Sequence, residues 1–329
     1  MAHTFPEARL VTLPDRGHGA ITLSVHDSGG GDDRPAVIFS HGFPELGYSW
    51  RYQVPAVADA GLRAIAPDQR GYGGSSAPDA VEAYDLECLC GDLADLCDAL
   101  GIERAVFVGH DWGGAVVWAM PEIHPERVAG LVGICTPNLP FPGTDFLRML
   151  VNGRIERQYM LWFQEPGVAE AQLDSRAALL FRKMMVGGLD PAIVMERAFA
   201  DGELDMNPFR DLDAMESIGD PIVSPEEVDH YIDVFSTTGF RGAVNWYRNL
   251  DRNLALHPRI STFDPAVPCL MITSEWDPAL PPAFAENMPN QIADLEMNMI
   301  PRGGHWVQQE YPAQVNAVLV EWLSRRFCS

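Results

Sequence analysis

Short apolar runs alternate with helical patterns in the first part of this 329-residue chain and again near its end. This alternation constrains the fold most, because fully apolar strands separated by helices predict a parallel sheet that is covered on both faces. An amphipathic helix is expected over residues 84–100 and a terminal helix over residues 311–327. The expected strands are residues 36–40, 62–67, 105–109, 128–136, 269–274 and 295–300.

Residues 140–266 interrupt this alternation, since helical patterns fill them with hardly a strand. Within them, Ser224 and Glu227 flank a proline in the pattern of a capping box, which predicts the start of a helix. We therefore expect an α/β fold in which residues 1–139 and 267–329 form the core domain and residues 140–266 form an inserted all-helical cap. Parallel sheets bind ligands at the carboxyl ends of their strands, so a cap placed there would cover the site and exclude water.

The segment Val108-Gly109-His110-Asp111-Trp112-Gly113-Gly114 directly follows an apolar strand. It has the strand-turn-helix layout that presents a nucleophile above a hydrolase sheet, with small residues two positions before and after the centre. A carboxylate that attacks a saturated carbon forms an ester, which water can cleave, whereas a serine would form an ether with no carbonyl to attack. Asp111 is therefore the expected nucleophile of a two-step displacement. The alternative is that Asp111 only caps the following helix.

Asp277 and His305 each lie just beyond an expected strand. The chain order of nucleophile, acid and histidine is the order of this kind of hydrolase. Histidine suits the role of base because its unperturbed pKa is about 6.5, and a carboxylate on its other nitrogen fixes the tautomer. Taken singly, Asp277 before Pro278 is also a good helix start, and His305 could be a surface histidine.

An oxyanion site is expected where Ser40-His41-Gly42-Phe43-Pro44 follows another apolar strand. A turn there can aim the backbone N–H of Phe43 at a developing negative charge, together with the N–H of Trp112. The alternative is a plain tight turn, for which glycine and proline are common.

The chain has 46 acidic and 23 basic residues and a net charge of −23. A field of that sign repels nucleic acids and anionic membranes, so neither is an expected partner. The six cysteines show no zinc-ligand spacing, and no signal peptide or membrane span is recognisable. We therefore expect a cytoplasmic protein without a metal ion or cofactor. The sequence leaves open whether the chain forms a homodimer.

Six segments of the chain form a combined pattern. They are His41-Gly42-Phe43-Pro44-Glu45, residues 68–73, residues 109–114, residues 159–167, residues 245–249 and Gly304-His305-Trp306. Together they resemble the soluble epoxide hydrolase family over roughly residues 36 to 312. The resemblance implies that the chain adds water to a small-molecule epoxide to give a vicinal diol. It also implies that Tyr159 and Tyr247 bind the epoxide oxygen, and a phenol with a pKa of about 10 is protonated at pH 7 and can donate its proton.

Individual residues of the sequence argue against four other functions. Haloalkane dehalogenases look similar around the nucleophile, but they usually have a halide-binding Asn where this chain has Phe43, and halide departure needs no tyrosine proton donors. Fluoroacetate dehalogenases typically have Arg where Trp112 stands. A serine esterase is disfavoured by Asp111 itself. A non-catalytic receptor on the same fold is marked by loss of a triad residue, and all three are present here.

Overall fold

The computed structural model describes residues 3–17, 19–30, 34–199, 201–216, 218–258, 264 and 266–328. Residues 259–263 and 265, at the end of the predicted cap, lie outside this set. The chain divides into two compact units. The first unit comprises Met1–Ala77, Leu86–Leu139 and Ile260–Ser329, and the second comprises Pro78–Asp85 and Pro140–Arg259.

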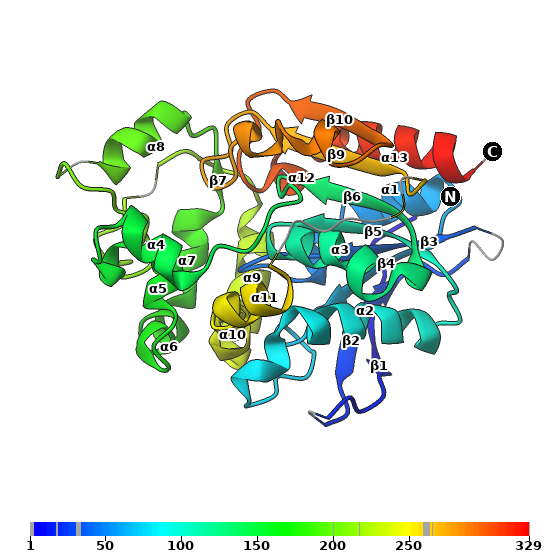
Figure 1. The fold of residues 1–329 in the computed structure, drawn as a ribbon, viewed down its shortest axis with the longest axis horizontal. Coiled ribbons are helices and arrows are strands. Elements are labelled where there is room, and N and C mark those ends of the chain that lie inside the picture. Colours follow the sequence, from blue (N-terminus) through cyan, green and yellow to red (C-terminus); the bar gives the residue numbers. More distant parts are fainter. Residues whose placement is uncertain are drawn as a thin grey trace. The chain divides into compact units, whose positions relative to one another are not determined.

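An eight-stranded sheet runs through the first unit (Figure 1). Its strands follow the order β1-β2-β4-β3-β5-β6-β9-β10. The pairs β1–β2 and β2–β4 are antiparallel, and every other neighbouring pair is parallel. The strands are β1 (Ala8–Thr12), β2 (Thr22–Asp27), β3 (Ala36–Ser40), β4 (Ala64–Asp68), β5 (Ala105–His110), β6 (Val128–Ile134), β9 (Cys269–Ser274) and β10 (Leu295–Ile300).

All six strands predicted from the sequence are present, so the expected mostly parallel sheet is confirmed. Three of them, β3, β9 and β10, have the predicted bounds, and the others differ by one or two residues. The prediction missed β1 and β2. Four of the five residues of β1 are exposed, and a solvated strand at the sheet edge lacks the continuous apolar run that identifies a buried one.

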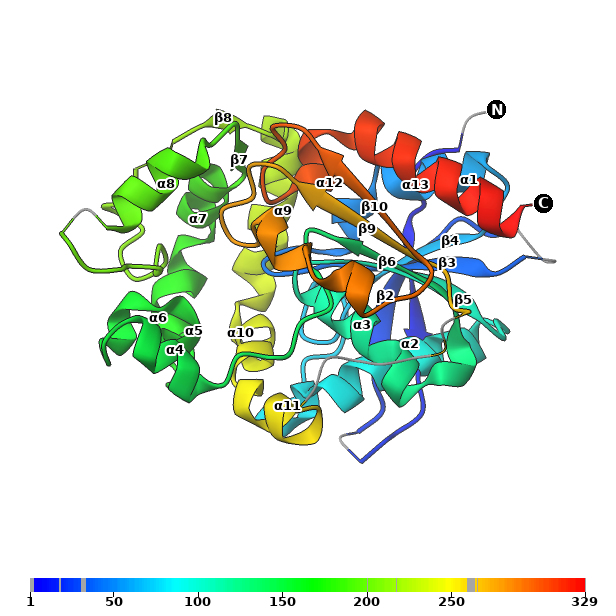
Figure 2. The same ribbon diagram turned by 45° about the horizontal axis from the view of Figure 1, so that its top comes forward.

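Helices cover both faces of this sheet, as Figures 1 and 2 show. On one face, Val54 of α1 (Gln53–Asp59) and Leu319 of α13 (Pro312–Phe327) join a core with Val106 and Val108 of β5. Successive strand residues point to opposite faces, so Phe107, which is fully buried, points to the other face. That face carries α2 (Leu86–Ala99) and α3 (Trp112–Ile123). The remaining helical elements of this unit are η1 (Gly47–Trp50), η3 (Pro125–Arg127), η6 (Pro282–Ala285), η7 (Met288–Asn290) and α12 (Val307–Glu310).

The second unit is built of short helices around an aromatic core. Phe181 of α7 packs against Tyr231 and Phe235 of α9, with ring centroids 5.4 and 5.0 Å apart. The predicted capping box is present, because the Glu227 N–H donates to Ser224 Oγ and the Ser224 N–H donates to Glu227 Oε2. The helical elements are η2 (Val81–Tyr84), α4 (Thr144–Leu150), η4 (Ile155–Arg157), α5 (Tyr159–Trp162), α6 (Val168–Leu173), η5 (Asp174–Arg176), α7 (Ala177–Met184), α8 (Pro191–Ala198), α9 (Pro225–Thr238), α10 (Arg241–Tyr247) and α11 (Leu250–Leu256).

Two features of the second unit differ from the sequence expectation. A two-residue antiparallel ladder joins β7 (Val186–Gly187) to β8 (Asp220–Pro221), so the inserted segment is not composed of helices alone. In addition, residues 78–85, expected in the core, belong to this unit. Asn249 Nδ2 donates to the carbonyl of Val81 at 2.7 Å, and Arg252 Nε donates to Asp85 at 2.7 Å. Short-range patterns carry no information about such contacts between distant segments.

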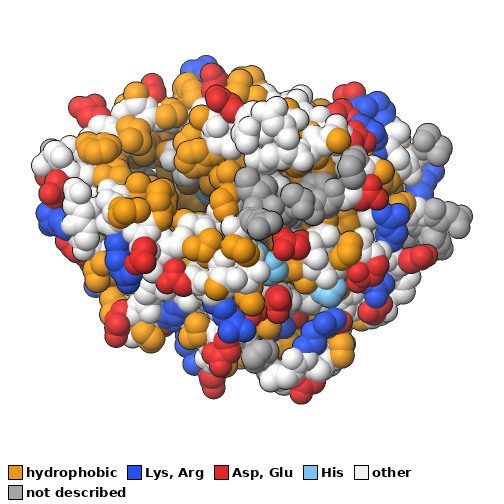
Figure 3. Space-filling model, viewed as in Figure 1, with side chains coloured by type: hydrophobic (Ala, Val, Ile, Leu, Met, Phe, Trp, Pro, Cys, Tyr) orange, Lys and Arg blue, Asp and Glu red, His pale blue; other side chains and the backbone are white. Residues whose placement is uncertain are grey.

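Exposed apolar side chains gather on the second unit, where Figure 3 shows clusters of hydrophobic side chains. They include Phe146 and Met149 of α4, Ile193 of α8 and Phe199, which follows α8. Within the described residues, no helix combines the length and apolar character that crossing a membrane requires.

Candidate active site

Asp111 lies in the sharp turn between β5 and α3, with φ 52° and ψ −123°. Few residues other than glycine adopt a positive φ. The turn also depends on its flanking glycines. A Cβ at Gly109 would lie 2.2 Å from the carbonyl oxygen of Gly113, and a Cβ at Gly113 would lie 2.0 Å from that of Ser40. The glycines that identify this motif in the sequence are therefore required by close backbone contacts.

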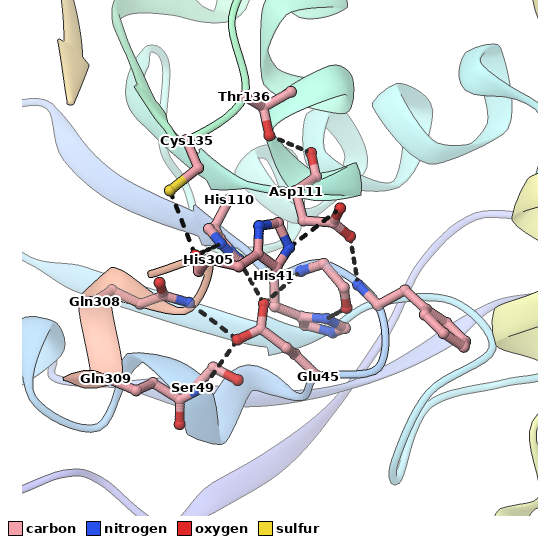
Figure 4. Close-up of polar contacts among 12 residues, drawn as sticks. His41, Glu45, Ser49, His110, Asp111, Cys135, Thr136, His305, Gln308 and Gln309 are labelled. Carbon is pink, nitrogen blue, oxygen red and sulfur yellow. Dashed lines mark hydrogen bonds and ion pairs between the residues drawn. The ribbon is translucent and has the colours of Figure 1, made fainter. Parts of the chain in front are cut away.

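The carboxylate of Asp111 accepts a hydrogen bond from the backbone N–H of Phe43, at 2.8 Å from Oδ1 (Figure 4). Its side chain makes no capping hydrogen bond to α3, every residue of which is described. The alternative interpretation of Asp111 as a helix cap is therefore wrong. The carboxylate points away from the helix that it precedes, toward the loop after β3.

His305 lies in the loop between β10 and α12, with its ring between two carboxylates. Nδ1 of His305 is 2.9 Å from Oδ2 of Asp277, and Nε2 is 3.7 Å from Oδ2 of Asp111. The structure thus brings Asp111, His305 and Asp277 together from three strand ends. His305 is also not a surface histidine, since only 11% of its side chain is exposed.

Asp277 is buried, and each of its carboxylate oxygens has partners. Oδ1 accepts the N–H groups of Ala279 and Leu280, at 2.8 and 2.9 Å, while Oδ2 contacts His305. No helix of the described residues starts at Asp277, since η6 begins at Pro282. The carboxylate holds both the turn after β9 and the histidine.

The electrostatic environment favours the ionised forms of Asp277 and His305. Burial works against the charge on His305, but Asp277, and more weakly Asp111, raise its pKa to about 9. Burial alone would raise the pKa of Asp277, whereas the charge and hydrogen bond of His305 and two backbone N–H groups hold it below its usual range. With a pKa of about 9 the ring is mostly protonated at pH 7, and the charge of Asp111 contributes to this.

A second buried network joins Glu45, His110 and the backbone carbonyl of His305 (Figure 4). Nδ1 of His110 is 2.8 Å from Oε2 of Glu45, and Nε2 is 2.7 Å from the carbonyl oxygen of His305. A backbone carbonyl can only accept, and the carboxylate also accepts from Gln308 and Gln309 at 2.9 Å. Both ring nitrogens of His110 therefore donate, and the ring forms a buried ion pair with Glu45.

The low pKa of Glu45 is consistent with an ion pair between Glu45 and His110. Burial would raise the pKa of Glu45, but the charge and hydrogen bond of His110, with smaller effects of His41 and the Gly42 N–H, lower it to about 2. Sequence reasoning quoted both residues within motifs but assigned neither a role. The available signal was an ionisable side chain inside an otherwise apolar strand, since such groups are rarely buried without a partner.

Two further side chains hold the backbone of the site. The Thr136 hydroxyl donates to the carbonyl of Asp111 at 2.8 Å, and Sγ of Cys135 donates to the carbonyl of His305 at 3.4 Å. Both residues follow β6, so they support Asp111 and His305 from one strand end (Figure 4). Nothing in the sequence around them signalled this contribution.

The remaining predicted residues are Trp112, Tyr159 and Tyr247. Trp112 is the first residue of α3 and is buried. Tyr159 and Tyr247 belong to the second unit, at the start of α5 and the end of α10, and their ring centroids are 5.6 Å apart at an interplanar angle of 74°. The two phenols are thus neighbours, although 88 positions separate them in the sequence. In the part of the chain that is described, no group of three or more His, Cys, Asp and Glu side chains is arranged to hold a metal ion.

Comparisons with known proteins agree with this geometry. A family model described as alpha/beta hydrolase fold matches residues 35–186. The chain is 44% identical over 301 residues to Epoxide hydrolase A of Mycobacterium tuberculosis (strain ATCC 25618 / H37Rv). The matched region covers 88% of this chain and 90% of the relative. It is 40% identical over 296 residues to Bifunctional epoxide hydrolase 2 of Sus scrofa, covering 88% of this chain and 51% of that protein, so it spans about half of that relative.

Solved structures give the same result. The crystal structure of Epoxide Hydrolase A from Mycobacterium thermoresistibile matches with a TM-score of 0.83 and 40% sequence identity, covering 96% of this chain and 98% of that one. An epoxide hydrolase from an endophytic Streptomyces matches with a TM-score of 0.82 and 32% identity.

Proposed function

The chain belongs to the epoxide hydrolase family of the α/β-hydrolase fold, and on that premise we propose that it converts an epoxide and water into a vicinal diol through an ester on Asp111. The observation that carries this proposal is the Asp111 carboxylate itself. It is held in a strained turn, does not cap its own helix and lies 3.7 Å from Nε2 of His305. Strained backbone of this kind is concentrated at functional sites.

In the first step, a carboxylate oxygen of Asp111 attacks an epoxide carbon. A C–O bond to Asp111 forms while the ring C–O bond breaks, and the ring oxygen takes a proton from Tyr159 or Tyr247. An alkoxide is a poor leaving group unless it is protonated as it forms, so the phenols would act as general acids. Their proximity to each other supports a shared role, and we propose that the second unit acts as the cap that supplies them.

In the second step, His305 removes a proton from a water molecule, whose oxygen attacks the ester carbonyl carbon of Asp111. The N–H of Phe43, which donates to Oδ1 at 2.8 Å, supports a role for it and for Trp112 in stabilising the resulting oxyanion. Collapse of this intermediate breaks the ester C–O bond, and the leaving oxygen takes the remaining proton of the intermediate, which releases the diol and regenerates the carboxylate. His305 then loses its extra proton to solvent, and the phenolate takes one from solvent. Esterification removes the negative charge of Asp111, which lowers the pKa of His305, so a larger fraction of the rings is neutral and able to take the proton of water.

Oxygen labelling tests this mechanism. With enzyme in excess over styrene oxide in ¹⁸O-water, the first turnover should yield a diol without label, because its new oxygen comes from Asp111. The label should appear in the Asp111 side chain, as measured by mass analysis of peptides. Label that enters the diol directly, or halide release from haloalkanes by a protein inert toward epoxides, would overturn the proposal.

We further propose a cytoplasmic protein that acts on small molecules and not on nucleic acids or membranes. The net charge of −23 supports this, since it disfavours anionic partners.

A further inference from the structure

Gln164 lies between the backbone segments that carry the two tyrosines of the second unit. Its Nε2 donates to the carbonyl of Met160 at 2.7 Å and to the carbonyl of Tyr247 at 2.8 Å. Both partners can only accept, so the amide NH₂ group must face them, and both of its hydrogens are used. One side chain therefore joins the residue after Tyr159 to Tyr247 itself.

The contact has a local cause. Met160 lies in α5, which has only four residues, and Tyr247 is the last residue of α10. The last four carbonyl groups of a helix have no partner within it. Gln164 satisfies one such carbonyl on each of the two helices and so bridges them.

Arg248 makes the reciprocal link from the other segment. Its Nε donates to the carbonyl of Phe163 at 2.9 Å, and its guanidinium forms two hydrogen bonds with the carboxylate of Glu170, at 2.7 and 3.0 Å. Only 4% of the Arg248 side chain is exposed. Hydrogen bonds thus join residues 163–164 to residues 247–248 in both directions.

The aromatic rings follow this arrangement. The ring centroid of Phe163 is 5.5 Å from that of Tyr159 and 5.0 Å from that of Tyr247. Phe163 precedes Gln164 and carries the carbonyl that Arg248 holds. A shift of this segment would therefore change the packing of both phenols at once.

We propose that Gln164 and Arg248 are positioning residues that set the separation of the Tyr159 and Tyr247 phenols and thereby control the ring-opening step. This inference rests on the proposed function, because it assumes that the phenols donate the proton. Small displacements of a catalytic group can cost about 10²-fold in rate. The effect should be confined to ester formation, since hydrolysis of the ester uses His305 and not the phenols.

The test is Gln164→Leu, which keeps a side chain of similar size without the amide. Gln172→Leu is the matched control, because Gln172 Nε2 also donates to a backbone carbonyl in this unit, that of Arg210 at 2.7 Å, but on an exposed surface. Single-turnover experiments with styrene oxide and rapid quenching give the rates of ester formation and ester hydrolysis from the mass of the protein. We expect ester formation to slow at least tenfold in Gln164→Leu and hydrolysis to stay within twofold, with both rates unchanged in Gln172→Leu.

Equal slowing of both steps, or no slowing of ester formation, would overturn the inference. If Gln164→Leu does not fold, Gln164→Met, whose flexible side chain adapts to the same space, is measured against the same criteria. Tyr159→Phe and Tyr247→Phe separate the two proposals. Slow ester formation in these variants beside normal rates in the Gln164 variant refutes the positioning role alone, whereas normal rates in the tyrosine variants refute the proposed role of the phenols.

Discussion

Nε2 of His110 donates a hydrogen bond to the carbonyl oxygen of His305 at 2.7 Å, so the residue that precedes the candidate nucleophile holds the backbone of the candidate base. Their ring centroids are 4.8 Å apart. The contact depends on Glu45, which pairs with the other nitrogen of His110. Three residues from separate segments are thus linked in a buried chain, and loss of any one of them affects its neighbours.

Removing the base should trap the ester. In His305→Gln the first step still proceeds, whereas hydrolysis should slow by about 10²–10⁴-fold, the usual contribution of a general base. Intact protein mass should increase by the mass of one epoxide molecule. The double variant Asp111→Asn, His305→Gln should show no adduct, and a lack of adduct in His305→Gln alone would contradict the two-step scheme.

Breaking the Glu45–His110 pair should destabilise the protein. Glu45→Gln leaves the His110 charge without its partner in a fully buried position, which costs about 3–5 kcal/mol. Urea unfolding measures the effect. The control is Glu321→Gln on α13, where the Glu321 side chain is 74% exposed and 3.7 Å from Arg325, and a surface pair contributes about 0–1 kcal/mol. Equal stability losses in the two variants would contradict the buried ion pair.

Adding one methyl group should distinguish two buried glycines. Gly113→Ala places a Cβ 2.0 Å from the Ser40 carbonyl oxygen, so it should cost about 1–3 kcal/mol or more. Gly91→Ala in α2 meets nothing closer than a side-chain carbon of Arg16 at 3.4 Å, and it should gain about 0.5–1 kcal/mol from helix propensity. Chemical unfolding compares the two variants, and a Gly113→Ala protein as stable as the parent would show that the turn tolerates a side chain.

Neutralising the nucleophile should lower the pKa of His305. The negative charge of Asp111 stabilises the imidazolium and helps to raise its pKa to about 9, so Asp111→Asn should shift the titration to lower pH. Asp277 remains in the variant, and the shift should therefore be partial. NMR titration of the His305 ring measures it. Identical midpoints in the parent and Asp111→Asn would show that the ester does not activate the base by charge removal.

Much of the catalytic centre could be predicted because its signals are local. A glycine on either side of Asp111 indicates a tight turn. A predicted strand before each of Asp111, Asp277 and His305 indicates that these residues lie at strand ends. In a parallel sheet such ends lie along one edge. These patterns were sufficient to predict the six parallel strands of the sheet and the proximity of Asp111, Asp277 and His305.

Other parts of the site depend on contacts between distant segments. The pairing of Glu45 with His110 and the cross-link from Gln164 to the Tyr247 carbonyl join residues 65 and 83 positions apart. The same is true of residues 78–85, which accept hydrogen bonds from Asn249 and from Arg252 of α11. No periodicity in the sequence indicates which distant residues pair in this way.

The sequence by itself therefore determined which residues are chemically able to act and at which strand ends they lie, because turn glycines and apolar periodicity are properties of a few adjacent residues. Only the tertiary structure decided which buried side chains hold them in place. Most buried donors and acceptors pair with another polar group, and only the folded chain brings the two groups of such a pair close together in space.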